Sequence, residues 1–153
     1  MAGNYKEARL EVEEYLITSH MIERLYRRFL GMLGNLLESD RVRDITPAQA
    51  VVLFHIGEKD VTVGELVNRG YYLGSNPSYN VRKMVEAKYL IQEKSPEDKR
   101  LIRLKLSEKG LDLRHKLQTI FQNQTLELIP KLVSETELRQ TNEILARLDR
   151  FWD

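Results

Sequence analysis

The side chains best suited to contact an anionic partner gather in two short segments of this sequence. The first segment combines an amide, hydroxyls, a guanidinium and an ammonium, which are the groups that bind phosphates and the edges of bases. Its members are Ser75, Asn76, Ser78, Tyr79, Asn80, Arg82 and Lys83. On a helix, Ser78 would share one face with Arg82, because residues four apart are neighbours there. The alternative is that Asn76 only caps a helix and Arg82 is solvated.

The second segment is a charged turn with four residues that could face the same partner: Asp98, Lys99, Arg100 and Arg103. Arg100 follows Asp98 by two positions, which is close enough for an ion pair that aims the guanidinium outward. An arginine held in this way suits a narrow minor groove of DNA, where the potential is most negative. Pairing in an exposed turn contributes less than about 1 kcal/mol, so its role would be orientation.

No set of residues in the sequence is typical of an enzyme. The three histidines, His20, His55 and His115, fall in separate predicted helices and lack the spacing of a metal site. Nucleophile motifs, phosphate-binding loops and dinucleotide fingerprints are missing from the sequence. It also has no cysteine that could act as nucleophile, thiolate ligand or redox sensor. We therefore expect no catalytic residue, no metal and no cofactor.

Charge is distributed unevenly along the 153 residues. The chain has 24 Lys and Arg against 23 Asp and Glu, so its net charge is +1. Residues 68–109 carry ten basic and five acidic side chains, a net charge of +5, which leaves −4 for the remainder. This asymmetry favours an anionic partner for residues 68–109, although a solvated basic face would give the same count. The length and the 42% apolar share fit one compact domain, or two lobes that share a core.

Capping signals predict the helices that would position these segments. Thr46-Pro47-Ala48-Gln49 is a capping box with proline at the first helical position, and Gly57 would end that helix. Thr62-Val63-Gly64-Glu65 repeats the box and starts a very short helix that Gly70 would close.

A third helix and a hairpin complete this lobe. The helix starts beside Pro77 and runs to about Lys88, with an inward face formed by Val81, Met84 and Val85. Residues 90–94 and 101–106 then read as strands, and the charged turn joins them as a β-hairpin. Three helices followed by a basic hairpin are the layout of a winged helix-turn-helix, in which the second helix of the pair enters the major groove of DNA. The expected fold is mainly α with a small hairpin wing, and the DNA-binding lobe covers residues 45–107.

Long apolar helices flank this lobe on both sides. Apolar residues recur at helical spacing from Leu10 to Leu37, and a later helix from Glu108 would be interrupted by Pro130. We expect residues 6–38 and 108–153 to form a helical dimerisation region. Its expected contacts are Leu10, Tyr15, Leu138, Leu145, Leu148, Phe151 and Trp152. The alternative is that the last helix packs back on the first helix of its own chain.

Residues 95–110, SPEDKRLIRLKLSEKG, resemble the wing of the MarR family of bacterial regulators. The shared features are Asp-x-Arg, the alternating strand and the start of the next helix. Ile45-Thr46-Pro47-Ala48-Gln49 and Thr62-Val63-Gly64-Glu65-Leu66 are similar to two preceding helices of the family. The resemblance covers nearly the whole chain and implies a single domain over residues 1–153, a homodimer with intertwined terminal helices, palindromic DNA sites and, usually, repression. It also implies the wing role for Asp98 and Arg100.

Two departures from the family pattern concern the third helix and the turn before it. Tyr79-Asn80 stands where many members have Thr-Arg, and Tyr71-Tyr72-Leu73-Gly74 replaces a short polar turn. The resemblance further implies that a small, often aromatic effector binds where the dimer helices meet the DNA-binding lobe. The candidates near that junction are His20, Arg24, Phe54, Tyr71 and Tyr72.

The sequence also bears on membrane association and on two other function classes. No apolar run reaches the roughly 18 residues that span a bilayer, and the N-terminus is too acidic for a signal peptide, so we expect a cytoplasmic protein without a membrane partner. A winged helix can also be a protein-interaction module, which would show no salt-dependent binding to DNA. A small-ligand enzyme on a helical scaffold would need turnover that no residue set here explains.

Overall fold

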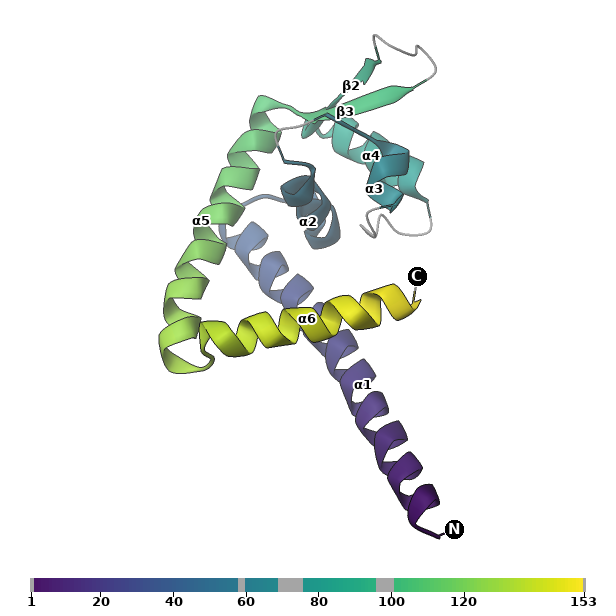
Figure 1. The fold of residues 1–153 in the computed structure, drawn as a ribbon. Helices are drawn as coiled ribbons and strands as arrows, with labels where there is room; N and C mark the ends of the chain where they lie inside the picture. The colour runs from purple at the N-terminus through teal and green to yellow at the C-terminus, as the bar shows by residue number, and fades with distance from the viewer. Residues whose placement is uncertain (1, 58–59, 69–75, 96–100, 153) are drawn as a thin grey trace.

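The computed structural model describes residues 2–57, 60–68, 76–95 and 101–152 as a mainly helical chain with a small sheet (Figure 1). This confirms the expected fold class. The helices and strands, in chain order, are α1 (Ala2–Ser39), α2 (Pro47–Ile56), β1 (Val61–Thr62), α3 (Val63–Asn68), α4 (Pro77–Glu86), β2 (Leu90–Lys94), β3 (Ile102–Leu106), α5 (Glu108–Lys131) and α6 (Glu135–Trp152). In the part of the chain described, no helix combines the length and the apolar character that crossing a membrane requires.

The predicted helix starts are confirmed by their hydrogen bonds. At the start of α2, Thr46 Oγ1 accepts from the Gln49 N–H at 3.2 Å, and Gln49 Oε1 accepts from the Thr46 N–H at 3.0 Å. The same reciprocal pair joins Thr62 and Glu65 at α3. Each box satisfies backbone donors that the first turn of a helix would otherwise leave unpaired. Local sequence is therefore enough to start these helices.

Two helices end without a glycine, and one of them, α4, ends before the expected residue. The third predicted helix, α4, stops at Glu86 rather than near Lys88, because Lys88 adopts a left-handed conformation with φ of 64°. The Tyr89 N–H then bonds the Met84 carbonyl at 2.9 Å, which closes the last turn. Arg41 does the same after α1, with φ of 59°. Glycine usually occupies this position, so the sequence did not signal either end.

The predicted end of the following helix at Pro130 is confirmed to within two residues. Helix α5 ends at Lys131, and α6 begins at Glu135. A proline removes one backbone donor, and position 130 is close to the end of the helix, where few bonds remain to be lost. The Leu132 N–H bonds the Leu128 carbonyl at 2.9 Å, and this bond closes the last turn of α5.

The sheet has three antiparallel strands in the order β1-β3-β2, so the predicted hairpin has one more strand than expected. In the hairpin, Leu90 pairs with Leu106 and Glu93 with Arg103. The added strand β1 contributes two residues and pairs Val61 with Leu104. Two residues are too few to show any period, so β1 follows from pairing with β3 and not from its own sequence.

The core lies inside the winged-helix lobe. Its most deeply buried large side chains come from six different elements and are Leu33, Leu53, Leu66, Met84, Leu104 and Leu117. Burial of one such side chain contributes about 1.5–3 kcal/mol. Helix α1 enters this core only with its C-terminal part. Further towards its N-terminus it exposes large apolar side chains, among them Val12, Tyr15, Leu16, Ile17, Met21, Leu25 and Tyr26.

Helix α6 lies across α1 of its own chain (Figure 1). The Trp152 Nε1–H donates to the Tyr15 hydroxyl at 3.1 Å, and Leu145 and Leu148 line a groove together with Ile22. The two helices meet at this crossing, but no residue of α6 is buried there. The crossing leaves apolar surface uncovered, because Phe151 is 75% exposed.

Candidate nucleic-acid interface

Helix α4 presents its polar residues on one face and its apolar residues on the other. Asn76 caps the helix by accepting from the Tyr79 N–H at 3.0 Å, and Pro77 follows at the first helical position. Val81 and Met84 are buried against the core. The outward face carries Ser78, Tyr79, Arg82 and Lys83, all of which are exposed. The predicted set from 76 to 83 therefore shares one face, with the exception of Asn80; Ser75 lies outside the described residues.

Asn80 is half-buried and faces α2. Its Oδ1 accepts from Gln49 Nε2 at 3.0 Å, and its own Nδ2 donates to the Asn76 carbonyl at 3.3 Å. Gln49 is also the residue that completes the capping box of α2. The amide of Asn80 thus links the starts of α2 and α4. The sequence analysis predicted a DNA contact for Asn80 and did not predict this link.

The two cations of α4 lie between an aromatic ring and a carboxylate. The Arg82 guanidinium lies 5.5 Å, and the Lys83 ammonium 5.7 Å, from the centre of the Tyr79 ring. On their other side is Glu86, with Lys83 Nζ at 2.9 Å from Oε2 and Arg82 Nε at 3.8 Å from Oε1. The hydrogen bond from Lys83 lowers the pKa of Glu86, and the same bond raises the pKa of Lys83. The sequence analysis did not include Glu86, although it follows Arg82 by four positions and Lys83 by three, a spacing that predicts ion pairs on a helix.

The described part of the wing carries further charge. Arg103 lies on β3, where it pairs with Glu93 of β2 and with Thr62 of β1. Lys105, also on β3, forms an ion pair with Glu93, which raises the pKa of Lys105. The tip residues Asp98, Lys99 and Arg100 lie outside the described residues.

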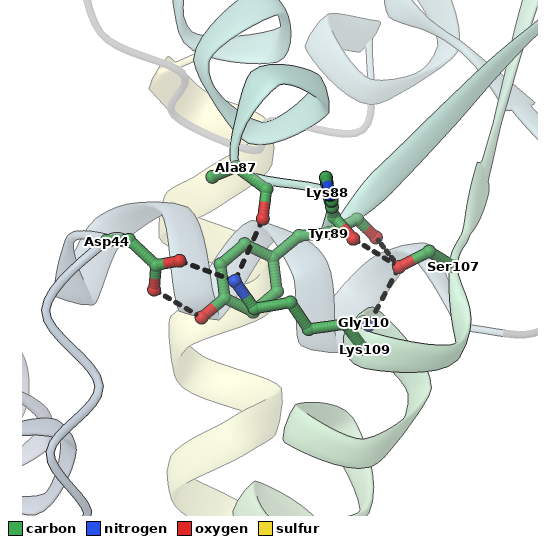
Figure 2. Close-up of polar contacts among 7 residues, drawn as sticks. All are labelled: Asp44, Ala87, Lys88, Tyr89, Ser107, Lys109 and Gly110. Carbon is green, nitrogen blue, oxygen red and sulfur yellow. Dashed lines mark hydrogen bonds and ion pairs between the residues drawn. The ribbon is translucent and has the colours of Figure 1, made fainter.

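Beside the C-terminal end of α4, the side chains of Asp44, Tyr89 and Lys109 join segments that are far apart in sequence (Figure 2). The Tyr89 hydroxyl donates to Asp44 Oδ1 at 2.7 Å, and Lys109 Nζ forms an ion pair with the other oxygen of Asp44. Lys109 also donates to the Ala87 carbonyl at 2.9 Å and lies 4.1 Å from the centre of the Tyr89 ring. Burial raises the pKa of Tyr89, and the hydrogen bond from Lys109 lowers that of Asp44. The exit of α4 is therefore fastened to the start of α5.

A backbone contact beside this cluster leaves no room for a side chain. Ser107 caps α5 by accepting from the Gly110 N–H at 3.0 Å, and its hydroxyl donates to the carbonyl of Lys88 (Figure 2). A Cβ atom on Gly110 would lie 2.3 Å from the Tyr89 carbonyl oxygen. Glycine is required here because the helix start and the strand start touch through their backbones.

The residues predicted to dimerise lie on α1 and α6. Tyr15, Leu145, Phe151 and Trp152 are exposed, whereas Leu138 and Leu148 are partly buried. Leu10 lies in the part of α1 for which only the backbone is described. The single chain therefore leaves most of the predicted dimerisation residues open to solvent.

The predicted effector residues do not form one site. His20 and Arg24 line a shallow groove on the surface of α1 together with Ile17 and Arg27. Phe54 is not part of that groove. Its ring packs edge-on against Phe121 of α5, with centroids 5.1 Å apart, and beside it lies the guanidinium of Arg114 at 5.9 Å. Tyr71 and Tyr72 lie outside the described residues. Among the residues that are described, no three His, Cys, Asp or Glu side chains gather as a metal site.

Comparison with known proteins points to one family. Residues 43–101 match the model of the MarR family. The exopolysaccharide II synthesis transcriptional activator ExpG of Rhizobium meliloti (strain 1021) is 46% identical over 99 residues, which are 65% of this chain and 51% of that protein. The chain thus spans about half the length of this relative.

Solved structures share the fold over most of the chain. FabT of Streptococcus pneumoniae, determined in complex with DNA, is 24% identical with a TM-score of 0.68, and the match covers 90% of this chain and 96% of FabT. BldR of Sulfolobus solfataricus, a transcriptional regulator, is 20% identical with a TM-score of 0.70 over 89% of this chain and 97% of BldR. The match to the MarR family of regulators agrees with the expectation that the chain is not an enzyme.

Proposed function

Because this chain belongs to the MarR family of winged helix-turn-helix regulators, we propose that it binds specific double-stranded DNA and regulates transcription. The observation that carries the proposal is the outward face of α4. It unites hydroxyls, an aromatic ring and two cations at the start of a capped helix, opposite the buried Val81 and Met84. This is the composition that base and phosphate recognition in the major groove requires.

In the proposed complex, α4 lies in the major groove and the wing reaches the adjacent minor groove. The Ser78 N–H in the first turn of α4 would donate to a phosphate, since Pro77 has no N–H and the Tyr79 N–H is bonded to Asn76. Arg82 would contact a base edge, and Lys83 a phosphate. Arg100, at the tip of the wing, would enter the minor groove, with Arg103 on the strand behind it.

We further propose that the protein is a homodimer. The support is the exposed apolar surface that α1 and α6 present, including Phe151 at 75% and Leu16 at 54% exposure. A surface of this kind is costly in water unless a partner covers it. Two-fold symmetry would place two copies of α4 on a palindromic site, with half-sites about one helical turn apart.

We further propose that a small aromatic effector binds at the junction of α2 and α5. The support is the packing of Phe54 against Phe121 and the nearby guanidinium of Arg114, which together suit an aromatic carboxylate. Benzoate serves as the probe. We expect millimolar benzoate to weaken DNA binding by the wild-type protein, with a smaller effect on Phe54→Leu. DNA binding that does not respond to benzoate would contradict this part of the proposal.

Selection from a pool of random duplexes, combined with light scattering, tests the main proposal. We expect a palindromic consensus, binding that weakens steeply with salt, and a mass twice the 18.0 kDa of one chain. Phe151→Glu should shift the mass towards one chain and weaken binding. Ile91→Glu, which changes an exposed residue of β2, is the matched control and should leave the mass unchanged.

Two outcomes would contradict the proposal. A monomer without sequence preference, or binding that salt does not weaken, would instead favour a protein-interaction module. The direction of regulation follows from a promoter reporter that carries the selected site: a repressor lowers the reporter output and an activator raises it.

A further inference from the structure

Glu86 occupies an unfavourable place for a carboxylate. It is the last residue of α4, where the helix dipole is negative and acidic side chains are destabilising. It is also the only acidic residue of this helix, whose outward face is otherwise neutral or basic. Its two partners, Arg82 and Lys83, are the charged residues that the proposed complex uses.

The geometry leaves one edge of Arg82 available. Glu86 approaches the guanidinium from the Nε side, at 3.8 Å, and the Tyr79 ring lies 5.5 Å from its central carbon. A bidentate contact with guanine can use the Nη1 and Nη2 edge. The ion pair and the base contact are therefore compatible, and Glu86 can stay in place when Arg82 meets a base.

We propose that Glu86 is a positioning residue for sequence recognition, which orients Arg82 for one guanine and weakens contacts with other sequences. The inference rests on the proposed function. Orientation increases affinity only where a base accepts the bidentate contact, since a guanidinium held in one rotamer loses less freedom on binding. On any other sequence the carboxylate only adds repulsion with the nearby phosphates. Glu86 should therefore raise the affinity for the selected site and lower the affinity for other DNA.

Glu86→Gln tests the proposal because glutamine keeps the size of the side chain and removes its charge. We compare binding to the selected duplex and to a scrambled duplex of equal length, at several salt concentrations. The variant should bind the selected duplex about fivefold more weakly and the scrambled duplex about twofold more tightly. Glu86→Gln should lose sequence preference at the same base pair as Arg82→Ala.

Two further variants separate orientation from general charge. Glu135 forms an ion pair of the same i, i+4 type with Arg139 on α6, so Glu135→Gln is the matched control and should leave the ratio of the two affinities unchanged. The double variant Arg82→Ala/Glu86→Gln should show no loss of base preference beyond that of Arg82→Ala alone.

The outcomes distinguish this inference from the function on which it rests. If the wild type binds no duplex in a salt-dependent manner, the proposed function fails and the inference fails with it. If the wild type is selective but Glu86→Gln moves both affinities in the same direction, the proposed function stands and the positioning role is overturned. Additive losses in the double variant would also overturn it, because Glu86 would then act independently of Arg82.

Discussion

Tyr89 donates a 2.7 Å hydrogen bond from its phenol to the carboxylate of Asp44, which lies 45 residues earlier in the chain. Asp44 comes just before α2, and Tyr89 lies between α4 and β2. Lys109, in the first turn of α5, completes the cluster by contacting both side chains (Figure 2). The end of α4, the helix proposed to read DNA, is therefore joined to the first turn of α5, which belongs to the proposed dimerisation region.

Tyr89→Phe should lower the free energy of unfolding by about 1–2 kcal/mol, because it leaves the ring in place and removes one hydrogen bond to a charged group. Urea titration at a fixed protein concentration measures the loss. Tyr79→Phe is the matched control, since the Tyr79 side chain is exposed, and should change the value by less than about 0.5 kcal/mol. Equal effects at the two positions would contradict the assignment.

The cluster should also contribute to acid sensitivity. Lys109 lowers the pKa of Asp44 below its ordinary value of 3.8 in the folded state. The stability that this carboxylate contributes is therefore complete above the unfolded pKa and is lost as the pH falls through the folded one. Wild-type stability should decline below about pH 5, and Asp44→Asn should decline less steeply. Urea titrations from pH 6 to 3 measure both curves, and parallel curves would exclude this contribution.

Gly110→Ala should destabilise the protein by more than about 2 kcal/mol, because the added Cβ would lie 2.3 Å from the Tyr89 carbonyl oxygen and the backbone would have to move. Gly31→Ala is the opposite case. A Cβ there meets no atom within 4 Å, and alanine favours a helix by up to about 1 kcal/mol over glycine. Thermal melting should place Gly110→Ala below the wild type and Gly31→Ala at or above it. A Gly110→Ala variant of wild-type stability would mean that these backbones do not touch.

Arg82→Ala and Arg100→Ala should weaken DNA binding in different ways. Arg82→Ala should relax the preference at one base pair, with a cost of about 1–3 kcal/mol on the selected site. Arg100→Ala should weaken binding to all sequences and reduce the slope of log affinity against log salt by about one. Titrations with a panel of single base-pair variants at several salt concentrations separate the two effects. If Arg100→Ala binds as tightly as the wild type, the wing makes no contact.

Features of the fold that depend on neighbouring residues could be predicted from the sequence. The capping boxes at Thr46 and Thr62 involve residues three apart, so their patterns are visible in the sequence and hold in the structure. The second hairpin strand, residues 102–106, shows its period of two directly. The helix ends at Arg41 and Lys88 could not be predicted, because non-glycine residues adopt a positive φ there and the usual signal is missing.

The candidate site also has features that the sequence predicts and features that it does not. The sequence by itself determined that residues 76–83 form a capped helix with a polar face, because cap and period lie within a few positions of one another. Only the tertiary structure decided that Asn80 turns inward to Gln49, and that Asp44, Tyr89 and Lys109 meet. Those contacts join residues 31 to 65 positions apart. Such pairs come together only when the hydrophobic core brings their segments into contact. A local sequence pattern does not specify which distant segments will meet.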